Sequence, residues 1–121
     1  MQRESMLSKM QICPVMTTVE VIGGKWKPRI LWYLRAGAAG FGHLQRAVGA
    51  SERMLSKSLK ELERDGVITR AVIPVGKVMT TEYAFSSYGL TLAPVLDAMG
   101  DWGLAHPPTS TALATARATR R

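Results

Sequence analysis

The chain has 121 residues, of which 46% are hydrophobic, and carries a formal net charge of +7. This length and composition predict a single folded domain rather than a disordered chain. No apolar run approaches the roughly 18 residues of a membrane span, and the first residues lack an apolar signal-peptide core. We therefore expect a soluble, cytoplasmic protein. The positive charge favours an anionic partner, either nucleic acid or a membrane surface.

The residue types that bind metals or perform catalysis are sparse. A single cysteine excludes an intrachain disulfide. Cys13, His43 and His106 are the only soft ligands and have no metal-site spacing, so we expect no metal and no other cofactor. There is no nucleophile–base–acid set and no phosphate-binding glycine loop, and His43 lies beside an apolar position. We do not expect an enzyme.

The first half of the chain predicts four helices separated by glycines. They are expected at residues 14–22, 27–37, 41–48 and 51–65. Pro14 suits a first helical position, and Gly23-Gly24 ends that helix. Gly49-Ala50 forms a tight turn before the fourth helix, which has Ser51 as its expected N-cap and ends at Gly66.

The fourth helix, residues 51–65, has two faces when it is wound at about 100° per residue. Leu55, Leu59 and Leu62 fall within one narrow arc, which predicts that this face packs into a core. The opposite arc is a column of cations, namely Arg53, Lys57, Lys60 and Arg64. Such a column is often only a solvated surface, but a helix that is buried on one side and cationic on the other is suited to bind a polyanion.

After Gly66 the hydrophobic period changes to the alternation of strands. Two strands are expected at 67–73 and 78–85, joined by a turn at 74–77. Ser86 or Ser87 then caps a last helix that runs to about Trp102, with Pro94 either bending it or lying where one hydrogen bond is dispensable. From Ala105 the composition predicts a disordered basic tail. The expected organisation is therefore an N-terminal arm at 1–12, a domain at 13–104 and a tail at 105–121.

The order of elements predicts the fold and the site. A short helix, a tight turn and a longer helix form a helix-turn-helix, and the hairpin that follows makes it winged, so the fold is mainly α with a small β-hairpin wing. The second helix of such a unit lies in the major groove and contacts bases mainly through its N-terminal residues. Base contacts are expected from Ser51, Glu52, Arg53, Ser56 and Lys57. Phosphate contacts are expected from Lys60 and Arg64, from Lys25, Lys27 and Arg29 before and at the start of the second helix, and from Arg70 and Lys77 of the hairpin.

Side-chain chemistry assigns roles within this site. Arg53 matches guanine O6 and N7, Glu52 is able to accept from cytosine N4, and Ser56 both donates and accepts. Two other interpretations stay open at this stage. A solvated surface explains Lys25, Lys27 and Arg29 as well as phosphate contacts do. A winged helix also serves as a protein-interaction module or an RNA binder, although the cationic helix has no aromatic residue on which single-stranded RNA bases would stack.

Three segments together carry a family resemblance. CPVMTTVEVIGGKWKPRILWYL (13–34), FGHLQRAVGASERMLSKSLKELERDGVITR (41–70) and EYAFSSYGLTLAPVLDAMGDWG (82–103) occur in this order. In this the chain resembles the HxlR-type transcriptional regulators, small bacterial winged-helix proteins related to the MarR type. The resemblance implies a homodimer joined through N- and C-terminal helices on an inverted-repeat operator. The last helix offers a seam for such a contact at Tyr88, Leu92, Val95, Met99 and Trp102, while its Leu92 and Leu96 side is expected to touch the core.

The resemblance also implies a role for Cys13. Some members of the family sense oxidants or electrophiles through a cysteine just before the first helix, where the helix dipole favours a reactive thiolate. Without a second cysteine, a Cys13–Cys13 bridge between subunits, a mixed disulfide or alkylation are the options, and a small buried apolar residue is the alternative. A small-molecule effector is a further option, in a cavity lined by Met16, Trp32, Met99 and Trp102, although four such residues are usually core.

Overall fold

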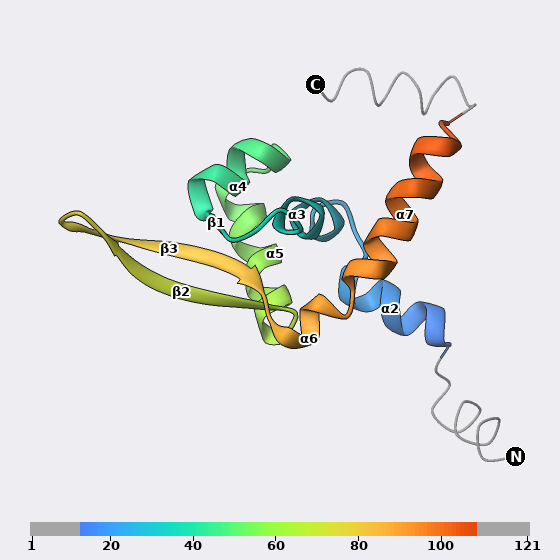
Figure 1. Cartoon of the computed structure of the whole chain (residues 1–121), viewed down its shortest axis with the longest axis horizontal. Coiled ribbons are helices and arrows are strands. Elements are labelled where there is room, and N and C mark those ends of the chain that lie inside the picture. Colours follow the sequence, from blue (N-terminus) through green and yellow to red (C-terminus); the bar gives the residue numbers. More distant parts are fainter. Residues whose placement is uncertain (1–12, 109–121) are drawn as a thin grey trace, which may run out of the picture.

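The computed structural model describes residues 13–108 and has a helical body with a long two-stranded wing. Its helices are α2 (Pro14–Ile22), α3 (Lys27–Leu34), α4 (Phe41–Val48), α5 (Glu52–Arg64), α6 (Ser87–Leu90) and α7 (Ala93–Ala105), and its strands are β1 (Ala39–Gly40), β2 (Ile68–Val75) and β3 (Val78–Phe85). The wing projects from one side of the body, and α2 and α7 lie on the opposite side (Figure 1). The expected arm at 1–12 and the part of the expected tail beyond residue 108 lie outside the described residues. Between residues 13 and 108, no helix is long and apolar enough to cross a membrane.

The wing is the predicted β-hairpin, and its first strand extends two residues further than predicted, to Val75. β2 and β3 pair antiparallel from Ile68 opposite Phe85 to Val75 opposite Val78, so the turn is shorter than the expected 74–77. Pro74 lies inside β2, where it is tolerated because β2 is an edge strand of a sheet ordered β1-β3-β2. The short strand β1, which pairs with β3, was not predicted.

The core is formed where α3, α4 and α5 meet, as the helix-turn-helix prediction requires. Leu31, Leu44, Leu55 and Leu62 are fully buried, and Leu59 is 1% exposed. Burial of a leucine side chain stabilises a fold by about 1.5–3 kcal/mol, so the leucine face of α5 attaches this helix firmly to the body. The two-faced pattern of α5 is therefore confirmed on its apolar side.

The prediction of one continuous last helix is wrong, because the structure divides it into α6 and α7. Ser86 caps α6 by accepting a hydrogen bond from the backbone N–H of Gly89 at 2.8 Å. Gly89 lies so close to Val67, the residue before β2, that a Cβ atom there would overlap the Val67 carbonyl oxygen. The chain then starts a new helix with Pro94 in its first turn, where a missing N–H is harmless. α7 continues beyond Trp102 through Ala105, so it includes the first residue of the expected tail.

Candidate DNA interface

α5 is positioned by a cap at its start and by a glycine at its end. The Ser51 side chain accepts a hydrogen bond from the Met54 N–H at 3.1 Å, as predicted. Gly49, with a φ of 75°, occupies the left-handed region and turns the chain from α4 into α5. Gly66, with a φ of 77°, ends the helix and directs the chain into the wing. These three residues set the direction in which the outer face of α5 points.

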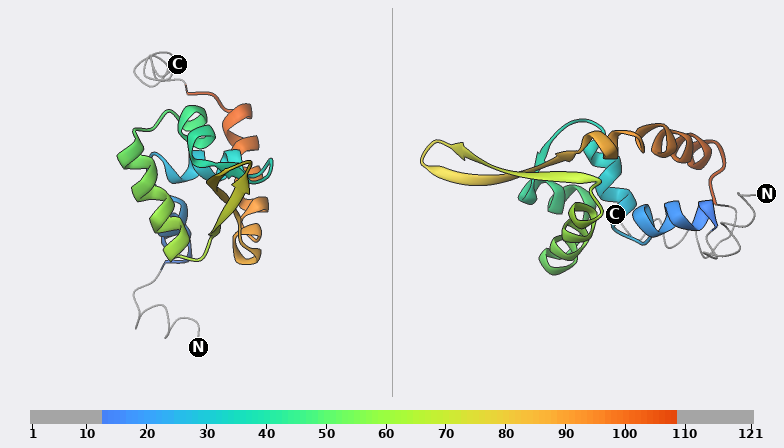
Figure 2. Two further views of the ribbon diagram at one scale, coloured as in Figure 1. Left: turned by 90° about the vertical axis from the view of Figure 1, so that its left-hand side faces the viewer. Right: turned by 90° about the horizontal axis from the view of Figure 1, so that it is seen from below.

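The outer face of α5 is open to solvent over its whole length. Figure 2 shows α5 as an outer helix next to the base of the wing. Of the predicted base-contacting residues, Ser51, Glu52, Arg53 and Lys57 are exposed and Ser56 is half-buried. Lys60 and Arg64, predicted to contact phosphates, are exposed on the later turns. The structure thus brings these seven predicted residues onto one accessible helix.

A groove between α5 and the wing joins two of the predicted phosphate contacts. A cavity of about 300 Å³ is lined by Ser56, Leu59, Lys60, Glu63, Arg70 and Tyr83. Lys60 from α5 and Arg70 from β2 therefore border the same hollow. Tyr83 lies opposite Arg70 on β3 and was not predicted, because its alternating position in the strand indicates only burial. Lys77 lies apart from this groove, in the hairpin turn.

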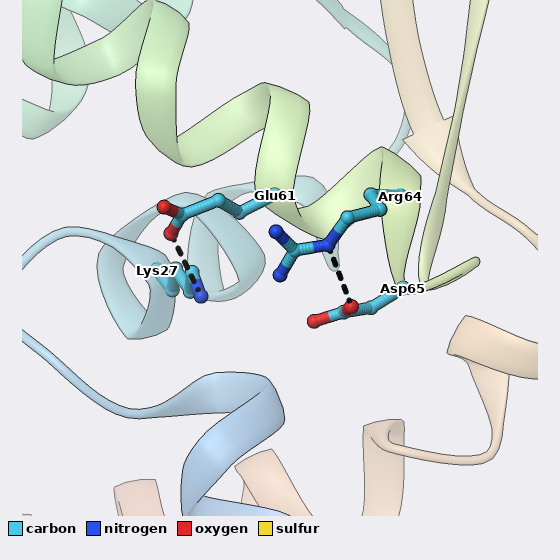
Figure 3. Close-up of polar contacts among 4 residues, drawn as sticks. All are labelled: Lys27, Glu61, Arg64 and Asp65. Carbon is cyan, nitrogen blue, oxygen red and sulfur yellow. Dashed lines mark hydrogen bonds and ion pairs between the residues drawn. The ribbon is translucent and has the colours of Figure 1, made fainter.

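Lys27 differs from the other predicted phosphate contacts because it binds an acid of α5. Its Nζ lies 3.0 Å from Oε1 of Glu61, and the side chains are only 14% and 30% exposed (Figure 3). The hydrogen bond from Lys27, followed by its charge, lowers the pKa of Glu61 below the usual value of 4.5. This ion pair joins the start of α3 to the outer helix, and sequence reasoning missed it because the partners are far apart in the chain.

The neighbouring cations of the α3 start are placed differently. Arg29 of α3 donates a hydrogen bond from Nη1 to the carbonyl oxygen of Val48 at 3.2 Å, so its side chain contacts the end of α4. Lys25 is exposed, with its Nζ 4.8 Å from the ring centroid of Trp26. On α5 itself, Arg64 pairs with the adjacent Asp65 at 3.3 Å (Figure 3), an exposed contact that salt screens readily.

The predicted dimer seam is divided by the break before α7. Tyr88 lies on α6, and Leu92 is half-buried against the core. Val95, Met99 and Trp102 remain together on α7 as exposed side chains, Trp102 with 66% of its surface accessible. Leu96 of the same helix is buried, as expected for the side that faces the body. The prediction of a continuous seam is therefore wrong, but the three seam residues on α7 still form an exposed apolar face.

Exposed apolar residues also occur on α2, beside which the predicted sensor lies. Val15, Met16 and Val19 are exposed there. Cys13, the N-cap of α2, is a free and exposed cysteine, so the alternative of a small buried residue does not describe this chain. Of the predicted effector cavity, Trp32 and Met99 line a common hollow, an open depression of about 260 Å³ to which Met16 and Trp102 do not contribute.

Comparison with known proteins identifies the family. Residues 21–110 match the family described as HxlR-like helix-turn-helix. The chain belongs to this family. It is 43% identical over 95 residues to the uncharacterised HTH-type transcriptional regulator YdeP of Bacillus subtilis, a match that covers 75% of this chain and 71% of YdeP.

Solved structures agree with this assignment. The redox regulator HypR in its oxidised form has a TM-score of 0.74 and 35% identity, covering 80% of this chain and all of HypR. The HTH-type transcriptional regulator YtcD has a TM-score of 0.71 and 41% identity, covering 78% of this chain and 97% of YtcD. The chain is therefore a winged helix-turn-helix transcriptional regulator of the HxlR type, and its partner is DNA. Its relatives are regulators rather than enzymes.

Proposed function

We propose that this HxlR-type protein acts as a homodimer that binds an inverted-repeat operator, with α5 of each protomer in a major groove. The observation that carries the proposal is the geometry of α5, whose leucine face is buried while its cationic face is fully accessible beside the wing. A helix in the major groove presents its N-terminal residues to base edges, so that part of α5 determines sequence preference.

The exposed residues and the half-buried Ser56 divide into two roles. The base-contacting group is Ser51, Glu52, Arg53, Ser56 and Lys57. The phosphate-contacting group is Lys60, Arg64, Arg70, Lys77 and Lys25. Two predicted residues are left out of this second group: Lys27, because its ammonium is paired with Glu61 and mostly covered, and Arg29, because its guanidinium donates to the carbonyl oxygen of Val48. The role of Lys27 is to hold α5 against α3.

The second copy of the chain binds through α2 and α7. Two observations support this assignment: both helices lie on the side opposite to the wing (Figure 2), and both carry exposed apolar residues, including Val19, Met99 and Trp102. Stable protein–protein interfaces bury about 1,200–2,000 Å² of surface, and an apolar face of this kind is suited to be buried in one. A dimer formed on this side leaves both copies of α5 free for DNA.

Selection of bound duplexes from a random pool tests the DNA part of the proposal. The selected sites should contain two inverted half-sites about one helical turn, 10–10.5 bp, or a multiple apart. Arg53→Ala should relax preference at one base pair of each half-site, whereas Lys60→Ala should weaken binding to all duplexes alike. Uniform loss in both variants would contradict the assigned roles, and a monomer in sedimentation velocity would contradict the dimer.

We further propose that oxidation of Cys13 alters DNA binding. Its thiol is free and exposed beside the apolar face of α2, and the similar protein HypR is described as a redox regulator. In a dimer joined through α2, the two Cys13 thiols would lose two electrons and two protons to an oxidant such as diamide and form one S–S bond. Diamide should then produce a reducible covalent dimer and change operator affinity. If Cys13→Ser protein responded to diamide equally, this part of the proposal would fail.

A further inference from the structure

α7 is attached to the body mainly through α3. Among the described elements, α3 is the one with which α7 makes its main contacts. Trp32 of α3 and Arg35, the residue that caps the end of α3, face two residues one turn apart on α7, Asp97 and Gly100. We call these four residues the α3–α7 joint.

The polar half of the joint is an ion pair stacked on an indole. Arg35 donates from Nε to Oδ1 of Asp97 at 2.9 Å. The guanidinium carbon of Arg35 lies 3.6 Å from the ring centroid of Trp32, within the range of a cation–π contact. The indole and the carboxylate thus bind the same guanidinium from two directions. An isolated ion pair on the surface contributes little to stability. Here stacking on Trp32 already restricts the Arg35 side chain, so the pair with Asp97 loses less conformational entropy.

The apolar half of the joint is a close approach at Gly100. A Cβ atom at this position would overlap Cη2 of Trp32 and lie 2.6 Å from Cζ3. Glycine inside a helix costs about 1 kcal/mol relative to alanine, so its presence here follows from packing rather than from helix formation. The backbone of α7 rests directly on the indole edge.

A hollow beside the joint leaves the start of α7 incompletely packed. A cavity of about 400 Å³ separates the start of α7 from the end of β3, and Arg35 and Asp97 both line it. The hollow therefore adjoins the joint, and α7 is held beside it by the Arg35–Asp97 pair, the Gly100 contact and the buried Leu96. These contacts place the joint where it is able to set the tilt of α7.

We propose that the α3–α7 joint selects the spacing between operator half-sites, by setting the angle between the dimerisation helix and the DNA-binding body. This inference rests on the proposed function, because spacing has meaning only for a dimer joined through α7. The 13 residues of α7 span about 20 Å at about 1.5 Å per residue. A displacement of about 1 Å at Gly100, about 10 Å from the helix start, moves the far end by about 2 Å in each protomer. Across a dimer this amounts to about 4 Å, close to the rise of about 3.4 Å of one base pair.

Gly100→Ala tests the joint, with Gly103→Ala as the matched control. Both variants gain the same helix propensity, but a Cβ at Gly103 has no neighbour within 4 Å. Each protein is titrated against inverted repeats whose spacer is changed in single base-pair steps. Gly100→Ala should bind the wild-type spacer about tenfold more weakly, a loss of about 1.4 kcal/mol, and should prefer a different spacer. Gly103→Ala should keep the wild-type preference.

Asp97→Asn provides a second test that adds no volume. Loss of the ion pair should leave the preferred spacer unchanged but reduce discrimination against neighbouring spacers about tenfold. Unchanged discrimination in this variant overturns the proposal, and so does an unchanged preference in dimeric Gly100→Ala or an equal change in Gly103→Ala. If the wild-type protein itself binds a single half-site as tightly as the inverted repeat, the proposed dimeric function fails together with the joint.

Discussion

Replacement of Lys60 by glutamine should lower the salt dependence of DNA binding by a calculable amount. Lys60 is exposed on α5 and borders the groove that also contains Arg70. Each phosphate contact contributes about 0.9 to the slope of log K against log salt on duplex DNA. A dimer loses two contacts, so the slope should fall by about 1.8. Between about 50 and 200 mM salt, the variant should therefore lose about tenfold less affinity than the wild type.

Fluorescence anisotropy on a labelled operator at several salt concentrations measures this slope directly. Lys27→Gln is the matched control, because it removes the same charge from a lysine that is paired with Glu61. Its slope should equal that of the wild type even if its affinity falls through a displaced α5. A wild-type slope in Lys60→Gln would refute the phosphate assignment of Lys60. An equal reduction in Lys27→Gln would refute the separation of the two lysines.

Three further predictions concern the elements that position the site, and each is checked by thermal denaturation. Because Lys27 lowers the pKa of Glu61, Glu61→Gln should destabilise the protein at a pH well above 4.5, where Glu61 is ionised in both the folded and the unfolded state. The difference in stability between the two proteins should vanish as the pH falls through the lowered pKa, and a difference independent of pH would contradict this prediction. Ser51→Ala should cost about 1 kcal/mol through loss of the α5 cap, and an unchanged melting temperature would show that the cap is dispensable. Gly89→Ala should destabilise by about 1–3 kcal/mol because its Cβ has no room, whereas Gly42→Ala, which meets only an ordinary contact, should not.

The parts of the fold that depend on local pattern were predictable from the sequence. The leucine spacing and the Ser51 cap defined α5, and the alternation after Gly66 defined the wing. Both signals come from residues only a few positions apart, so the spacing of apolar residues in the sequence directly indicates a helix or a strand. The exposure of Arg53 and Lys57 followed from the same periodicity. The outer face of the candidate site was therefore accessible to prediction.

The contacts that orient these elements were not predictable, because they join distant segments. β1 has the sequence Ala39-Gly40, which shows no strand preference and forms only because β3 is available beside it. The Lys27–Glu61 and Arg35–Asp97 pairs depend on how helices pack. Gly89 lies directly against Val67, the residue before β2, and α6 ends at the next residue even though the helical period of the apolar residues continues.

The placement of α3 connects DNA recognition to dimerisation in the proposed function. One end of this helix of eight residues binds α5 through Lys27 and Glu61, and the other end lies against α7 through Trp32 and Arg35. The span between them is only about 12 Å. α2, which begins after Cys13, also packs on α3. In the proposed dimer, a change at Cys13 or in α7 would therefore act on α5 through α3, because α3 contacts α2, α5 and α7.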